Sequence, residues 1–189
     1  MPRLIMLALS ALLLGFTITA GAAAQSWTVV STESRIGFSG THAGTTFKGT
    51  FETWSAEIRF DPEDLANSKA VVTVDLTSAR TGNATYDKTL PSADWLDTAS
   101  AKTAVFETQS ITRTDNGDYL ADGQLRLRGA DIPVKLAFTL KIDGETAVMT
   151  GTSTIARLDF GIGKTSDASG AWVSLEIPLE IKVTAKRTS

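Results

Sequence analysis

The most constraining feature of this chain is a strict alternation of side chains between Ile132 and Ile142. Every even position in this stretch is large and apolar, whereas the odd positions are Pro133, Lys135, Ala137, Thr139 and Lys141. A period of two is typical of a strand with one buried face and one mostly polar face. The pattern returns between Val173 and Thr184, and at about 3.3 Å per residue each stretch is roughly 36 Å long. Two such strands need one shared apolar interior, where we expect the function to lie.

Other strand-like segments fill most of the remaining chain, with almost no helix between them. This pattern favours an all-β antiparallel barrel or sandwich. The apolar positions within residues 45–60 switch from odd to even, which predicts a bulge or corner near Glu52 and Thr53. The nine strand-like segments are residues 27–30, 35–39, 45–60, 70–76, 104–112, 119–127, 133–142, 147–160 and 172–185.

The segment from Thr81 to Ser100 is the exception, because it shows no alternation. We predict a short helix there, capped near Asn83 or Thr85 and broken at Pro91. Its apolar side chains are placed to close one end of a barrel. They are Tyr86, Leu90, Trp95 and Leu96.

The N-terminus is typical of a secretory signal. Arg3 precedes an apolar stretch over residues 4–18, and a small-residue site follows at Ala22 to Ala24. We predict that residues 1–24 are a signal peptide and that residues 25–189 form one exported, periplasmic domain. An uncleaved membrane anchor is the alternative, although the apolar stretch is short for a spanning helix. The chain has no Cys, so a lipid anchor on a modified Cys is excluded.

Charge and composition narrow the function further. Without Arg3 the exported part would carry 17 basic and 21 acidic residues, a net charge of −4, which argues against nucleic acid as a partner. Without Cys and with a single His, His42, a zinc or copper site is a poor match to metal preferences. We therefore expect no metal and no cofactor other than a bound lipid.

Candidate catalytic groups are few. His42 is the only imidazole, and Asp87, Asp94 and Asp97 lie close together in the sequence. A small exported hydrolase using Asp87 or Asp94 with His42 is one hypothesis. The alternative for the carboxylates is that they cap and solvate the short helix.

One strand suggests empty space inside the barrel. In residues 147–160, Val148, Thr150, Thr152 and Thr154 share the parity of Phe160. If that parity faces inward, small side chains leave apolar volume that a ligand can fill. Ordinary core packing is the competing interpretation, because small barrels are often filled by their own side chains.

An ordered set of motifs resembles the YceI-like family of exported lipocalin-like barrels. The set spans Trp27 to the C-terminus, and the order of its motifs is more specific than any one of them. Residues 99–104 depart from the pattern, because Ala101-Lys102-Thr103 stands where the family often has a Pro. The matching motifs are Ser34-Arg35-Ile36-Gly37-Phe38, Phe47-Lys48-Gly49-Thr50-Phe51, Ile58-Arg59-Phe60-Asp61-Pro62-Glu63-Asp64-Leu65, Thr81-Gly82-Asn83 with Asp87 and Leu90, Ser92-Ala93-Asp94-Trp95-Leu96-Asp97, Gly123-Gln124-Leu125-Arg126-Leu127-Arg128-Gly129 and Arg157-Leu158-Asp159-Phe160-Gly161-Ile162-Gly163.

The resemblance implies an eight-stranded antiparallel lipocalin-like barrel, with the short helical segment near one end, that holds a long polyisoprenoid such as a quinone or prenyl phosphate. We therefore predict a carrier with no covalent chemistry of its own. A membrane protein that supplies or accepts the lipid is a candidate partner, and a filled barrel acting as an interaction module is a further alternative. The oligomeric state is left open.

The alternation of odd and even positions along the strands indicates which side chains face inward and are expected to contact the lipid tail. Three polar side chains are candidate head-group contacts. The expected head-group contacts are His42, Arg80 and Arg157. The expected tail contacts are Phe38, Phe51, Ile58, Phe60, Phe106, Leu127, Leu136, Phe138, Phe160 and Leu175.

Overall fold

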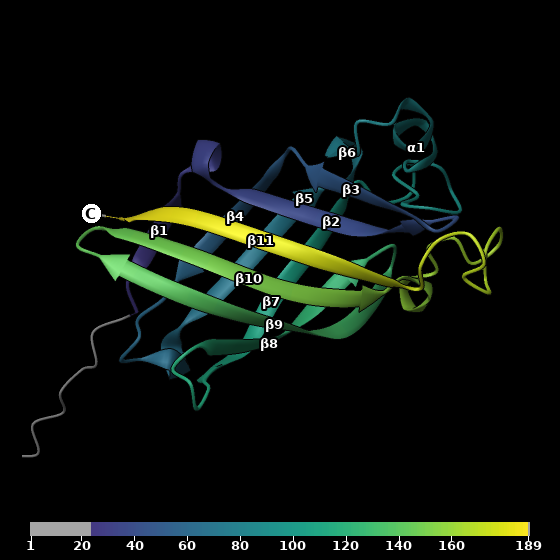
Figure 1. The fold of residues 1–189 in the computed structure, drawn as a ribbon. Coiled ribbons are helices and arrows are strands. Elements are labelled where there is room, and N and C mark those ends of the chain that lie inside the picture. The colour runs from purple at the N-terminus through teal and green to yellow at the C-terminus, as the bar shows by residue number, and fades with distance from the viewer. Residues whose placement is uncertain (1–23, 189) are drawn as a thin grey trace, which may run out of the picture.

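The computed structural model describes residues 24–188, which form a barrel of long strands with one short helix at one end (Figure 1). The predicted signal peptide lies outside the described residues except for Ala24. The strands are β1 (Ser26–Val29), β2 (Arg35–His42), β3 (Thr45–Phe51), β4 (Trp54–Arg59), β5 (Lys69–Asp75), β6 (Ala79–Arg80), β7 (Thr103–Arg113), β8 (Tyr119–Leu127), β9 (Ala130–Asp143), β10 (Thr146–Ala156) and β11 (Glu176–Arg187). The helices are α1 (Ala84–Thr89) and four short 3-10 turns, η1 (Ser31–Glu33), η2 (Leu65–Asn67), η3 (Leu76–Ser78) and η4 (Arg157–Phe160).

Eight strands close into a ring in the order β1, β4, β5, β7, β8, β9, β10 and β11. The ring closes because β1 pairs with β4 on one side and with β11 on the other. Every neighbouring pair is antiparallel. The predicted antiparallel eight-stranded barrel is thus confirmed, and its closure leaves β11 no free edge over its last residues.

The predicted corner in residues 45–60 is present. β3 ends at Phe51 and β4 begins at Trp54, and the two residues between them bond to the η3 turn. Glu52 N–H donates to Ser78 O at 3.2 Å and Thr53 N–H donates to Ser78 Oγ at 3.0 Å. The corner lets β3 pair with β2 while β4 pairs with β1.

The alternating strands face the interior as expected. Along β9 the even side chains are buried or half-buried and the odd side chains Lys135 and Lys141 are exposed. Two buried clusters fill the ends of the barrel: Phe160 and Ile162 belong to one, and Tyr119 belongs to the other. In the second cluster the rings of Tyr119 and Phe138 are stacked, with centroids 5.1 Å apart.

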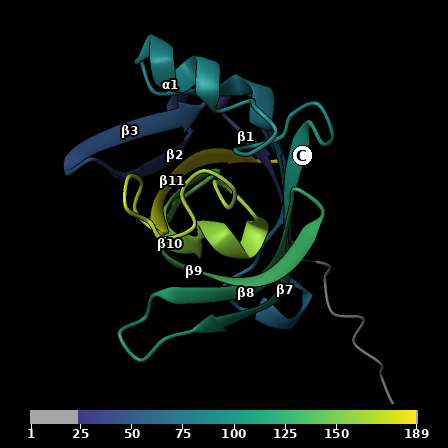
Figure 2. The ribbon, with the colours of Figure 1, turned by 90° about the vertical axis from the view of Figure 1, so that its right-hand side faces the viewer.

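The prediction for residues 147–160 was wrong in two respects. β10 ends at Ala156 and the chain then turns through η4, which fills the mouth of the barrel in the view along its axis (Figure 2). The inner face of β10 also carries the odd residues, so that Gly151 is buried and Thr152 is exposed. The odd-numbered and the even-numbered residues of this strand both include small and apolar side chains, so the sequence does not show which set faces inward. The strand pairing shows it, because Gly151 lies opposite Phe138 of β9 and Ile181 of β11, which both face the interior.

The predicted short helix is present as α1. Its N-cap is Asn83, whose Oδ1 accepts hydrogen bonds from Thr85 N–H at 2.9 Å and Tyr86 N–H at 3.3 Å. This satisfies two of the free amide groups at the helix start. Within residues 24–188 no helix is long and apolar enough to cross a membrane.

Candidate functional site

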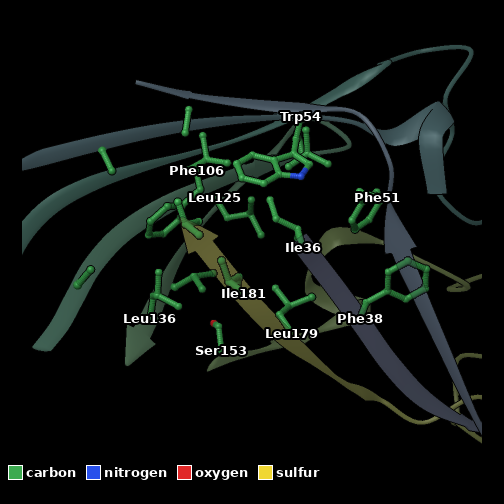
Figure 3. A pocket seen from close by; sticks show the side chains of 18 of the residues that line it. Ile36, Phe38, Phe51, Trp54, Phe106, Leu125, Leu136, Ser153, Leu179 and Ile181 are labelled. Carbon is green, nitrogen blue, oxygen red and sulfur yellow. The ribbon is translucent and has the colours of Figure 1, made fainter. Parts of the chain in front are cut away.

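The barrel encloses an apolar cavity of about 290 Å³ between the two buried clusters. Its wall draws on almost every strand, and Figure 3 shows side chains from opposite strands converging on it. Small side chains on the inner face of β10, notably Ala147 and Ser153, leave room on that side. The free volume expected from the sequence therefore exists, although residues of the opposite parity provide it.

The structure places eight of the ten expected tail contacts on the cavity wall. These are Phe38, Phe51, Ile58, Phe60, Phe106, Leu127, Leu136 and Phe138. Seven of them lie on β2, β3, β4, β7, β8 or β9, and Phe60 directly follows β4. A ligand in the cavity would therefore be contacted from several strands at once.

Leu175 and Phe160 do not line the cavity. Leu175 precedes the start of β11 and is 43% exposed, because the alternation in the sequence extends further than the strand does. Phe160 is buried at 3% exposure in the cluster at one end of the barrel. The η4 turn rotates it away from the direction that a continued strand would give.

Several cavity-lining residues escaped the sequence prediction. Ile36 and Trp54 line the cavity beside the expected aromatic residues, and Leu179 and Ile181 line it from β11 (Figure 3). The alternation of the C-terminal strand already marked Leu179 and Ile181 as inward. Trp54 belongs to the same even-numbered apolar set as Ile58 and Phe60, so the pattern after the corner already pointed to it.

Two hydroxyl groups in the cavity wall, those of Ser153 and Thr108, are engaged within the protein. Ser153 Oγ donates to Lys135 O at 2.7 Å. The Thr108 hydroxyl accepts from Ala70 N–H at 2.8 Å and donates to Ala70 O at 3.3 Å. Among the described residues, no buried side-chain nitrogen or oxygen lacks a hydrogen-bond partner. The wall therefore offers a ligand contact area rather than unsatisfied polar groups.

Arg157 lines the cavity but does not offer its charge to a ligand. The side chain is fully buried and ion-paired with Asp167, with Nη2 2.8 Å from Oδ2. Nε donates to Ser174 O, Nη1 to Ile162 O, and Nη2 also to Asp167 O and Val173 O. These bonds fasten η4 to the segment before β11, so the geometry assigns Arg157 a structural role in place of the expected head-group contact.

Arg80 and His42 lie outside the cavity wall. Arg80 Nη1 donates to Thr77 O at 2.9 Å and to Ala79 O at 2.7 Å, which ties it to its own turn. His42 Nδ1 is 3.0 Å from the Tyr86 hydroxyl. Neither side chain lines the cavity, so a head-group contact by Arg80 or His42 stays a prediction.

The two carboxylates of the hydrolase hypothesis hold the local backbone. Asp87 accepts from the hydroxyl and the N–H of Thr81, and these bonds lower the pKa of its carboxyl. The hydroxyl of Ser166, followed by the amides of Thr165 and Ser166, lowers the pKa of Asp94 to about 2. No hydrogen bond joins His42 to either carboxylate in residues 24–188. Carboxyls with lowered pKa values are ionised near neutral pH and hold no proton to donate as general acids. In the same residues no group of three or more His, Asp or Glu could hold a metal ion.

Comparison with known proteins agrees with this architecture. A sequence profile of the YceI-like domain matches residues 27–185. The chain belongs to the YceI-like family. A UPF0312 protein of Vibrio parahaemolyticus is 32% identical over 152 residues, covering 77% of this chain and 79% of its own length. One from Ectopseudomonas mendocina is 31% identical and covers 93% of this chain and 96% of its own length.

Solved structures share the YceI-like fold. BcnA of Burkholderia cenocepacia matches with a TM-score of 0.80 at 24% identity, covering 84% of this chain and 99% of its own. A polyisoprenoid binding domain from Saccharophagus degradans matches with a TM-score of 0.65 at 15% identity, over 87% of this chain and 99% of its own. The YceI protein of Campylobacter jejuni matches with a TM-score of 0.64 at 26% identity, over 76% and 86%.

Proposed function

We propose that this YceI-like protein is an exported carrier that sequesters a long-chain polyisoprenoid lipid, such as a quinone or prenyl phosphate, inside its barrel. The observation that carries the proposal is the cavity inside the barrel, whose lining side chains are almost all apolar. The Saccharophagus degradans domain of similar fold is described as polyisoprenoid-binding, which supports the same class of ligand here.

Contact area is enough to hold such a lipid. Burial of about ten methylene equivalents at about 0.8 kcal/mol each gives about 8 kcal/mol, close to a micromolar dissociation constant before the tail is ordered. The aromatic and branched side chains around the cavity supply this area without any charged partner. We therefore expect binding to depend on chain length more than on the head group.

A binding role fits the polar groups better than catalysis does. Asp87, Asp94 and Arg157 are each committed to hydrogen bonds that hold turns in place. Within the proposal, the periplasm is the compartment and a membrane protein that exchanges the lipid is the partner.

Mass spectrometry of lipid extracted from purified protein tests the proposed ligand. We expect a prenyl lipid in stoichiometric amount, because an apolar cavity of this kind would retain its ligand through purification. Extraction from a Phe138→Asp variant, with a carboxylate in the cavity, is the matched control and should yield much less. A wild-type protein that is empty and takes up no added isoprenoid quinone would contradict the proposal.

Export is tested by the mass of the protein recovered from the periplasm. The small-residue site at Ala22 to Ala24 predicts cleavage after Ala24, so the mature chain should begin at Gln25. A soluble protein that retains residues 4–18 would show that the predicted processing is wrong.

A further inference from the structure

Two of the three large apolar side chains that stand exposed among the described residues lie close together at one end of the barrel. Trp172 is 61% exposed and Leu175 is 43% exposed, and both belong to the segment between η4 and β11. The third is Val148, which is 36% exposed and lies near the start of β10, by the opposite end (Figure 1). The exposed apolar surface is therefore concentrated at the end that carries α1 and η4.

The backbone beneath Trp172 is held firmly. Asp167 accepts from Trp172 N–H at 3.2 Å and from Val173 N–H at 2.8 Å. Trp172 O accepts from Ala43 N–H at 2.8 Å. An exposed indole on a fixed base loses little conformational entropy when it inserts into an apolar phase.

A series of neighbouring rings connects Trp172 with the cavity. The imidazole of His42 stacks near Trp172 with centroids 6.4 Å apart, and the ring of Tyr86 lies 5.3 Å from His42. Phe47, whose side chain lines the cavity, is 6.1 Å from Tyr86. These spacings fall within the usual range for contacting aromatic pairs, so aromatic surface runs from the exposed indole to the lipid cavity.

We propose that this end of the barrel, with Trp172 and Leu175 as anchors, docks onto the surface of a lipid bilayer. The proposal rests on the proposed function, because a carrier of a membrane lipid must collect or deliver it at a bilayer. An indole is suited to the membrane interface, where its ring lies in apolar surroundings while its N–H stays wet. Val173, between the two anchors, lines the cavity, so the docked surface and the binding site meet in one segment.

The size of the surface favours a bilayer over a protein partner. A stable protein interface buries roughly 800 Å² on each partner, far more than one Trp and one Leu supply. A bilayer needs no matching surface, and a few apolar side chains are enough for reversible contact. The chain has a formal net charge of −3, so attraction to anionic lipids is not the source of binding and we expect little dependence on salt.

Quenching of tryptophan fluorescence by brominated phosphatidylcholine vesicles tests the docking surface. We expect quenching in the wild type that Trp172→Ser removes, and vesicle partitioning reduced about tenfold or more by Trp172→Ser, since burial of an indole accounts for a change of that size. Leu175→Ser should weaken partitioning in the same direction. Val148→Ser is the matched control and should behave like the wild type. All variants are expressed from the full sequence and purified in the same way, so that any difference between them comes from the substitution.

The outcomes separate docking from lipid binding. Equal quenching and partitioning of wild type and Trp172→Ser would overturn the docking proposal. So would a loss of self-association in Trp172→Ser with unchanged vesicle binding, because the surface would then be a protein interface. Extracted lipid should be the same in wild type, Trp172→Ser and Val148→Ser. An empty wild type that still shows Trp172-dependent quenching would contradict the carrier function and leave the docking intact.

Discussion

At the scale of single residues, Arg157 is a buried charged side chain that holds neighbouring segments together and does not bind a ligand. Its guanidinium meets one carboxylate and four backbone carbonyls, so its charge is neutralised and each of its three nitrogens donates a hydrogen bond. Arg157→Met should lower the free energy of unfolding by about 3 kcal/mol or more, because these carbonyls and Asp167 would be left without partners. Denaturant unfolding measures the loss. Arg128→Met, which removes a less buried guanidinium at the same end, is the comparison, and an Arg157→Met protein as stable as wild type would refute the structural role.

Phe138 and Lys141 give a second test at this scale, because they lie on opposite faces of β9. Phe138 is 9% exposed and lines the cavity, whereas Lys141 is exposed. Phe138→Asp should abolish folding or lipid retention, since an unpaired buried carboxylate costs several kcal/mol, comparable with the whole stability of a domain. Lys141→Asp should change little. Equal melting temperatures and equal lipid content in the two variants would contradict the assigned faces.

At the scale of elements, β10 offers a matched pair of neighbouring residues. Ser153 lines the cavity and Thr152 is exposed on the outer face. Ser153→Trp should expel the lipid while the sheet remains folded, because the indole occupies the space of the tail. Thr152→Trp should retain it. Lipid stoichiometry after identical purification is the measurement, with circular dichroism as the check on folding, and the reverse order of retention would show that the lipid does not occupy this part of the barrel.

The same strand shows how far the sequence alone can predict this protein. Strict alternation in β9 fixed its inner face, and the resemblance to the YceI-like family supplied the closed barrel. In β10 both faces mix small and apolar side chains, so only pairing with β9 and β11 reveals that Gly151 and Ser153 face inward. For Arg157 the sequence shows a basic residue at a strand end, but its carbonyl partners come from segments up to 17 residues away. Such contacts are set by tertiary structure, which a local pattern does not contain.

At the scale of the whole molecule, the two ends of the barrel are closed differently. One end is filled by packed aromatic rings, including Phe60, Tyr119 and Phe138. The other end also holds a buried apolar cluster, which includes Phe160 and Ile162, and there hydrogen bonds also join the loop after α1 to the loop after η4. Gly163 N–H donates to Asp94 O at 2.6 Å, and the Asp94 carboxylate accepts from residues 165 and 166. Apolar packing does not depend on pH, whereas the Asp94 carboxylate loses its charge when it is protonated. Acid should therefore weaken the contacts at the second end before those at the first.

The pKa of Asp94, lowered from its ordinary 3.8 to about 2 chiefly by the Ser166 hydroxyl, sets the pH range of this effect. A carboxyl whose pKa is lower in the folded protein stabilises the fold above its unfolded pKa, and that stability is lost as pH falls through the folded value. Wild-type stability should therefore decline between about pH 4 and pH 2 more steeply than that of Asp94→Asn, which should be less stable near neutral pH. The contribution is modest because the carboxylate is partly solvated.

Thermal unfolding followed by circular dichroism from pH 6 to pH 2 measures the difference in stability between wild type and Asp94→Asn, with exposed Asp115→Asn as the control. Parallel pH profiles for wild type and Asp94→Asn would show that the loops at this end are held together without the Asp94 carboxylate.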